Sequence, residues 1–174
     1  MDNLDDLLGP QSLEDEIEKN PSVSDTFEDL MQFAMEQEEA EYAFFSALAK
    51  RADTGDAKQI WREHAKEELA NKQKLEDIMA AHKIPASEKI IADPDLKIAK
   101  YLVSKGRNKT DKLGYEDALI LSIKRTRSTQ NLYMDLKETD CHAEILDAFS
   151  FLARVKEDQC RKLEQEYDDM LRED

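Results

Sequence analysis

The feature that most constrains this chain is a pattern that occurs twice, at an offset of 88 positions and without a gap. The offset aligns Phe27-Glu28-Asp29-Leu30 with Tyr115-Glu116-Asp117-Ala118. It also aligns Lys74-Leu75-Glu76 with Lys162-Leu163-Glu164, so the match extends over the length of two helices. Self-similarity over such a length indicates an internal duplication.

Each copy predicts a helical hairpin, because its apolar residues recur at steps of three and four. In the first copy, a helix begins near Thr26, with Ser24 or Asp25 as its cap. It ends at Asp53-Thr54-Gly55-Asp56, where the glycine suits a left-handed C-terminal position. A second helix begins at the last of these residues and ends before Pro85. Two long helices joined by so short a loop are antiparallel neighbours.

The second copy predicts a second hairpin, with helices from Tyr115 to Thr139 and from about Ala143 to Met170. Before it, a cap at Asp93-Pro94 starts a short helix that ends near Lys105. This connection is long enough to run the length of a bundle, so the second and third long helices should be parallel. Only four Gly and four Pro occur, too few for a β-sandwich. The predicted fold class is all-α, a four-helix bundle of two related hairpins with a long crossover.

The N-terminal residues differ in composition from the rest of the chain. Residues 1–24 hold seven acids and one base, and breakers stand at Gly9-Pro10 and Asn20-Pro21. They bury too little apolar surface to order themselves, so we expect a tail. Its apolar residues could dock on a partner protein as short helical turns; they are Leu4, Leu7, Leu8, Leu13 and Ile17. The predicted organisation is therefore this tail and a bundle at 25–174, with hairpins at 26–83 and 115–171 and a crossover at 84–114.

Charge and hydropathy limit the partners and the compartment. The chain has 25 Lys and Arg against 40 Asp and Glu, a net charge of -15, so it would repel nucleic acids and anionic membranes. The acidic start and the lack of a long apolar run predict a soluble, cytoplasmic protein. Cys141 and Cys160 form no C-x-x-C pair, and we expect two inert thiols.

Two carboxylates interrupt the apolar stripes. Glu38 and Glu68 fall on predicted core positions of facing helices, where an ionised carboxylate is costly unless it is paired or binds a cation. In bundles of this topology the partner can be two metal ions, held by a glutamate from each of two helices and a Glu-x-x-His step from each of the other two. Carboxylate oxygens and imidazole suit iron or manganese.

The chain resembles the rubrerythrin branch of the ferritin-like superfamily over about residues 26–171. The segments that carry the resemblance are Met35 to Phe45 with Leu48-Ala49, Trp61 to Met79, Asp95 to Val103, and Tyr115 to Leu119. The resemblance implies a ferritin-like fold, a homodimer and a di-iron site. Full-length rubrerythrins add a rubredoxin-like iron domain with two C-x-x-C pairs, and this sequence has none.

When the chain is matched to the family, most of the di-iron ligands are replaced. Of the six ligand positions, only Glu38 and Glu68 keep their residues. The other four positions hold Thr126, Asn71, Lys156 and Gln159. No Asp or Glu occurs between Ala118 and Met134, so no shift of register supplies a carboxylate from the third long helix. The resemblance therefore implies a degenerate metal site.

Two arrangements of these residues remain open. In the first, the Lys156 ammonium supplies the positive charge between Glu38 and Glu68. The hydrogen bonds are then completed by Asn71, Gln159 and Thr126. In the second, the lysine side chain extends to solvent and the site stays open.

A histidine offers a smaller site. His64 lies one turn before Glu68 on the same predicted face. With Glu38 or Glu41 it could hold a single zinc or iron ion. Alternatively, its ring is hydrogen-bonded to Tyr42 or Glu41. The candidate metal ligands are therefore Glu38, Glu41, His64 and Glu68.

Three functions follow from these alternatives. The first is a structural or interaction module with no metal, cofactor or activity. The second is a protein that binds one iron or zinc ion, and the third is a rubrerythrin-type oxidoreductase that reduces peroxide with an outside electron donor. A basic run from Lys97 to Lys112, extended by Lys124, Arg125 and Arg127, is expected at the surface, where it could receive an acidic tail, including that of a second copy.

Overall fold

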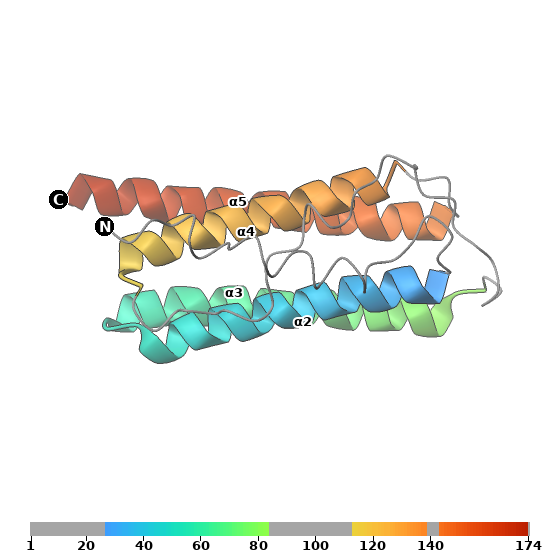
Figure 1. The fold of residues 1–174 in the computed structure, drawn as a ribbon, viewed down its shortest axis with the longest axis horizontal. Helices are drawn as coiled ribbons and strands as arrows, with labels where there is room; N and C mark the ends of the chain where they lie inside the picture. Colours follow the sequence, from blue (N-terminus) through green and yellow to red (C-terminus); the bar gives the residue numbers. More distant parts are fainter. Residues whose placement is uncertain (1–26, 84–112, 139–142, 174) are drawn as a thin grey trace, which may run out of the picture.

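The computed structural model describes residues 27–83, 113–138 and 143–173, and these residues form four helices and no strand. The helices are α2 (Phe27–Arg51), α3 (Gly55–Ala81), α4 (Tyr115–Leu136) and α5 (Ala143–Glu173) (Figure 1). The predicted all-α class and four long helices are therefore confirmed. Within the described ranges, none of these helices is apolar enough over sufficient length to cross a lipid bilayer.

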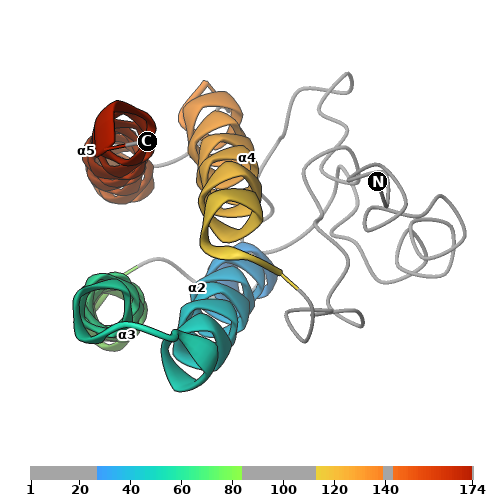
Figure 2. The ribbon, with the colours of Figure 1, turned by 90° about the vertical axis from the view of Figure 1, so that its left-hand side faces the viewer.

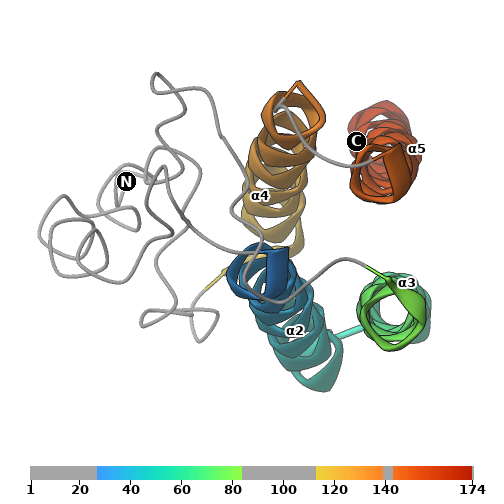
Figure 3. The ribbon, with the colours of Figure 1, turned by 90° about the vertical axis from the view of Figure 1, so that its right-hand side faces the viewer.

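The four helices form a bundle of two hairpins. Seen along the bundle, α2 and α3 make one hairpin and α4 and α5 the other, with α2 beside α4 and α3 beside α5 (Figures 2 and 3). In Figure 1, α3 and α4 run in the same direction, and α2 and α5 run in the opposite one. The second and third long helices are thus parallel, as expected from the length of the crossover.

The starts of α4 and α5 agree with the predicted ones, whereas α4 ends three residues before Thr139 and α5 three residues after Met170. The first turn also differs from the prediction. Gly55 was expected in a left-handed position that ends the first helix, but no described glycine has a positive φ. It is instead the first residue of α3, and Thr54 is the N-cap, whose hydroxyl accepts a hydrogen bond from the Ala57 N–H at 3.2 Å. The hydroxyl satisfies one of the free N–H groups of the helix start, so the turn needs no glycine geometry.

The internal repeat is visible in the helix starts and in the pattern of burial. The helices α4 and α5 begin 88 residues after α2 and α3, at Tyr115 against Phe27 and at Ala143 against Gly55. Every buried residue of α4 has a buried counterpart at the same offset in α2. The first helices of the two hairpins therefore share most of their buried positions, although their side chains differ.

The core has two apolar clusters with a polar layer between them. One cluster gathers around Phe27, Leu75 and Phe149 at one end of the bundle, and the other around Phe45, Trp61 and Leu119 at the other end. The steps of three and four along α2 predict that Tyr42 faces inward, and this is wrong: its side chain is 39% exposed, and Glu41 is buried instead.

Several predictions concern residues that the structure does not describe. They are the tail at 1–24, the caps Ser24 and Asp25, most of the crossover at 84–114 with its short helix, the basic run from Lys97 to Lys112, and Cys141.

A candidate site in the central polar layer

The central polar layer consists of buried polar side chains from all four helices, halfway along the bundle. Its members are Glu38, Glu41, Glu68, Asn71, Arg125, Thr126, Tyr133, Lys156 and Gln159. Each is at most 5% exposed. Isolated charges at this depth would be costly, so the partners of each charge decide what the layer can do.

Lys156 on α5 lies between the two glutamates that interrupt the apolar stripes. Its Nζ is 2.9 Å from Oε2 of Glu38 on α2, and it donates a hydrogen bond to Oε2 of Glu68 on α3. The side chains of all three residues are completely or almost completely shielded from solvent. The ion cluster predicted from the sequence is present, and the lysine does not extend to solvent.

Glu38 receives hydrogen bonds from two further helices. Asn71 of α3 donates its Nδ2–H to Oε2 at 3.0 Å, and Tyr133 of α4 donates its hydroxyl to Oε1. Together with Lys156, these donors connect α2 to α3, α4 and α5 through one carboxylate. Because one carboxylate is bonded to donors on three other helices, the network orients the helices relative to one another. Its hydrogen bonds are strong, since a charged acceptor forms stronger hydrogen bonds than a neutral one.

The surroundings drive the pKa values of the two glutamates apart. Burial alone would raise the pKa of Glu38, but the Lys156 ammonium and the hydrogen bonds outweigh it, so the pKa is lowered. For Glu68, burial and the neighbouring Glu38 carboxylate together exceed the effect of Lys156 and raise its pKa well above the ordinary value. Burial opposes the charge of Lys156, but the two glutamates raise its pKa. The surroundings therefore favour the ionised form of Glu38 and the charged form of Lys156, whereas burial beside the Glu38 carboxylate favours the protonated form of Glu68.

A second buried ion pair joins α2 to α4. Arg125 donates from Nη2 to Oε1 of Glu41 at 2.8 Å and from Nε to Oε2 at 3.2 Å. Its guanidinium also lies over the Phe44 ring, 4.3 Å from the centroid. The prediction that Arg125 lies at the surface is therefore wrong, since its side chain is buried. The repeat offset pairs Arg125 with Gln37, and the structure buries both side chains.

The buried charges are divided between the hairpins. The first hairpin supplies the acids Glu38, Glu41 and Glu68, whereas the second supplies the bases Arg125 and Lys156. Each ion pair therefore crosses from one hairpin to the other. Neither hairpin could bury its own share of the layer without the other, because each would leave unpaired charges in an apolar core.

The remaining positions predicted for the site contribute less. Gln159 and Thr126 are 1% exposed, but neither the Gln159 amide nor the Thr126 hydroxyl has a hydrogen-bond partner among the described residues. The expectation that they complete the hydrogen bonds of the cluster is therefore not met. Asn71 does so, and Tyr133 of α4 is an additional donor that was not predicted.

His64 lies apart from these carboxylates. Its ring stacks on Phe45 with the centroids 5.1 Å apart, and its Nδ1 is 3.8 Å from Oε2 of Glu67. That Nδ1 has no hydrogen-bond partner, so the expected bond from it to Tyr42 or Glu41 is absent from the described structure. Burial lowers the pKa of His64 to about 4, more than the Glu67 carboxylate raises it. The ring is neutral at physiological pH.

The donor set does not fit the pair of metal ions that the family resemblance implies. Both remaining glutamates already hold the Lys156 ammonium, and Glu41 is engaged by Arg125 on both oxygens. Within the described ranges, no group of three or more His, Cys, Asp or Glu side chains is arranged to hold a metal ion. Cys160 is a buried free thiol whose pKa is raised by burial and by Glu164, in agreement with an unreactive cysteine.

Comparisons of this chain with protein-family models, with curated proteins and with solved structures found no match.

Proposed function

We propose that the protein is a ferritin-like bundle of the rubrerythrin type whose metal centre has been replaced by an internal ion cluster, and that it serves as a non-catalytic structural or interaction module. One observation carries the proposal: the Lys156 ammonium binds both Glu38 and Glu68, the two ligands that remain from the family pattern. The resemblance of the sequence to that family supplies the rest. By the same resemblance, the module forms a homodimer.

In this proposal, buried side-chain cations take the place of metal ions. In a metal centre of this kind, the metal ions compensate the charge of the surrounding carboxylates. Here Lys156 and Arg125 provide that compensation from within the chain. A metal ion that entered the layer would have to displace an ammonium from Glu38 and leave it buried without its partner, which is costly.

Metal analysis of the full chain tests the proposal. The protein is produced in medium supplemented with iron and zinc, without a metal-binding tag, and its metal content is measured by inductively coupled plasma mass spectrometry. We expect far less than one ion per chain. Two iron or manganese ions per chain would overturn the proposal in favour of a peroxide-reducing oxidoreductase. One tightly bound iron or zinc ion that is lost in Glu68→Ala would establish a mononuclear site instead.

A further inference from the structure

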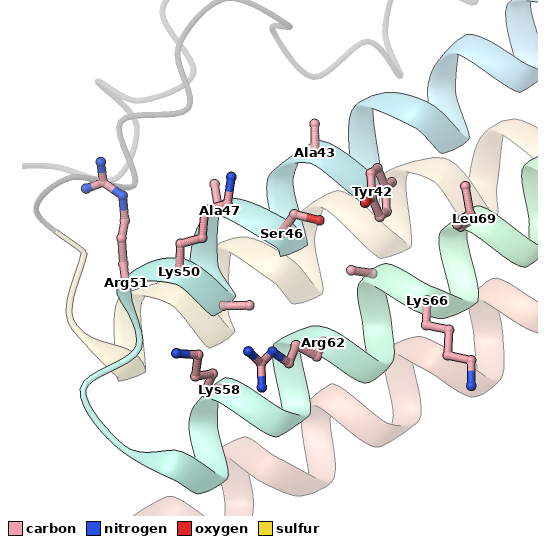
Figure 4. A pocket seen from close by; sticks show the side chains of 12 residues that line it. Tyr42, Ala43, Ser46, Ala47, Lys50, Arg51, Lys58, Arg62, Lys66 and Leu69 are labelled. Carbon is pink, nitrogen blue, oxygen red and sulfur yellow. The ribbon is translucent and has the colours of Figure 1, made fainter.

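An open groove of about 980 Å³ runs along the outer side of the α2–α3 hairpin (Figure 4). Among the described residues that line it there is no Asp or Glu, and the basic ones are Lys50, Arg51, Lys58, Arg62 and Lys66. Between them the surface is apolar and small, with Ala43 and Ala47 on α2 and Ala65 on α3. Tyr42 and Leu69, which lie at the end far from the turn, are 39% and 51% exposed.

Four of these cations have no acidic partner in the described part of the chain. No side-chain hydrogen bond or ion pair joins Lys50, Lys58, Arg62 or Lys66 to a described residue. Elsewhere on the surface, Lys72 pairs with Glu39 at 2.9 Å and Lys162 pairs with Glu67. In a chain with a net charge of -15, a groove of unpaired cations is an exception that solubility does not require.

The groove is also specific to one hairpin. At the repeat offset, Lys50 corresponds to Glu138 in the second hairpin, and the exposed Leu69 corresponds to Glu157. Of the four unpaired cations, only Lys66 has a basic counterpart at this offset. The second hairpin therefore folds without these basic and apolar residues, and their character in the first hairpin is not needed for the fold.

We propose that this groove binds residues 1–24 of the same chain. That segment holds seven acids and one base, which complements the unpaired cations of the groove. Its apolar residues, including Leu4, Leu7, Leu8 and Leu13, match the alanine surface and the exposed Tyr42 and Leu69. The inference goes beyond the proposed function, since it does not depend on the state of the metal ligands.

The connection to α2 makes an intramolecular contact feasible. The segment leads into Phe27 at the start of α2, and Ala43 lies about 24 Å further along the same helix. A chain of 24 residues spans up to about 80 Å when extended, so it can turn back along α2 to the groove. A short tether gives a high effective concentration, which favours the chain's own segment over that of a second copy.

Methyl NMR of the full chain tests this proposal. We expect nuclear Overhauser contacts from leucine methyls of residues 1–24 to the methyls of Ala43, Ala47 and Leu69. They should weaken when the salt concentration rises, since salt screens the charges. The variant Arg62→Glu with Lys66→Glu should lose them, because two attractive charges become repulsive. Contacts that persist in this variant would overturn the proposal.

A control variant and mixed labelling show whether the contacts belong to this groove and to a single chain. Arg154→Glu with Arg161→Glu changes the net charge equally on exposed positions of α5, and Arg154 is the repeat counterpart of Lys66. This control should keep the contacts. In a mixture of differently labelled copies, contacts between chains would assign the groove to the segment of a second copy. Complete absence of contacts would mean that the groove does not bind residues 1–24 and is open to another partner. Either result overturns the proposal, whatever the metal content shows.

Discussion

Among single residues, Lys156 has the largest influence on the core. It is fully buried and is the only charged donor to Glu38 within the described structure. Without it, Glu38 would keep only the neutral donors Asn71 and Tyr133. A buried carboxylate that loses its counter-charge either pays a large desolvation cost or takes up a proton.

We therefore predict that Lys156→Met lowers the free energy of unfolding by about 3–5 kcal/mol, the range found when one partner of a buried ion pair is removed. Methionine keeps much of the side-chain volume, so the loss of charge dominates. Urea unfolding at pH 7, followed by circular dichroism, measures the change.

The control is Lys162→Met on the same helix, whose 59% exposed ammonium pairs with Glu67. It should cost well under 1 kcal/mol, as exposed pairs do. Adding Glu38→Gln to Lys156→Met should recover part of the loss, because the uncompensated charge is then removed. Equal effects at the two lysines would contradict the role given to Lys156.

Only part of the central polar layer could be predicted from the sequence. Lys156 could be placed from the sequence because it occupies a core position of a regular stripe and corresponds to Glu68 in the repeat. Arg125 and Tyr133 could not be assigned partners in this way. A long guanidinium side chain can point to solvent or inward from the same backbone position, and only the neighbouring helix decides.

At the scale of the helices, the bases of α4 and α5 face the acids of α2 and α3. The pair of Glu41 and Arg125 is the part of this arrangement that connects α2 directly to α4. Its two parallel hydrogen bonds and its burial distinguish it from the surface pairs of the bundle.

A double-mutant cycle with Glu41→Gln and Arg125→Gln should give a coupling energy of about 2 kcal/mol, as expected for a buried, charge-assisted pair. The comparison pair is Arg127 with Glu164, which joins α4 to α5 at the surface with side chains 58% and 43% exposed. Its coupling should be well under 1 kcal/mol. Similar coupling energies for both pairs would show that the buried pair does not hold the hairpins together.

The helix boundaries were predictable from apolar spacing, and both hairpins begin where the repeat requires. The predicted C-terminal role of Gly55 failed because Thr54 offered a better local solution as an N-cap. Local rules identify a turn more readily than they identify which of its residues ends one helix and which begins the next.

For the whole molecule, the buried titratable groups predict how stability changes with pH. Glu38 and His64 change the stability of the fold in the acid range, since folding lowers the pKa of both groups. The stability from a lowered pKa is present above the unfolded value and is lost as pH falls through the folded value. For His64 this window runs from 6.5 down to about 4. Glu68 acts in the opposite direction: its raised pKa stabilises the fold at low pH, and that contribution is lost as pH rises.

We predict that His64→Leu removes about 3 kcal/mol of the stability loss between pH 7 and pH 4, because each pKa unit corresponds to about 1.4 kcal/mol. Leucine is the residue at the repeat counterpart, Leu152, which is also buried. The measurement is the difference between the unfolding free energies of variant and parent across this range. Parallel curves would contradict the prediction, because they would mean that folding does not change the pKa of the ring.

The sequence by itself determined the class of fold, the four helices, their pairing and the two glutamates that need a counter-charge. These features follow from periodicity, loop length and the cost of burying a carboxylate, all of which act locally or on a single helix face. Only the tertiary structure decided that Tyr133 donates to Glu38 and Arg125 to Glu41, and that Glu41 rather than Tyr42 is buried. It also decided that cations without an acidic partner in the described structure line an outer groove. Those outcomes depend on the rotation of each helix against its neighbours, which side-chain packing of the whole bundle sets.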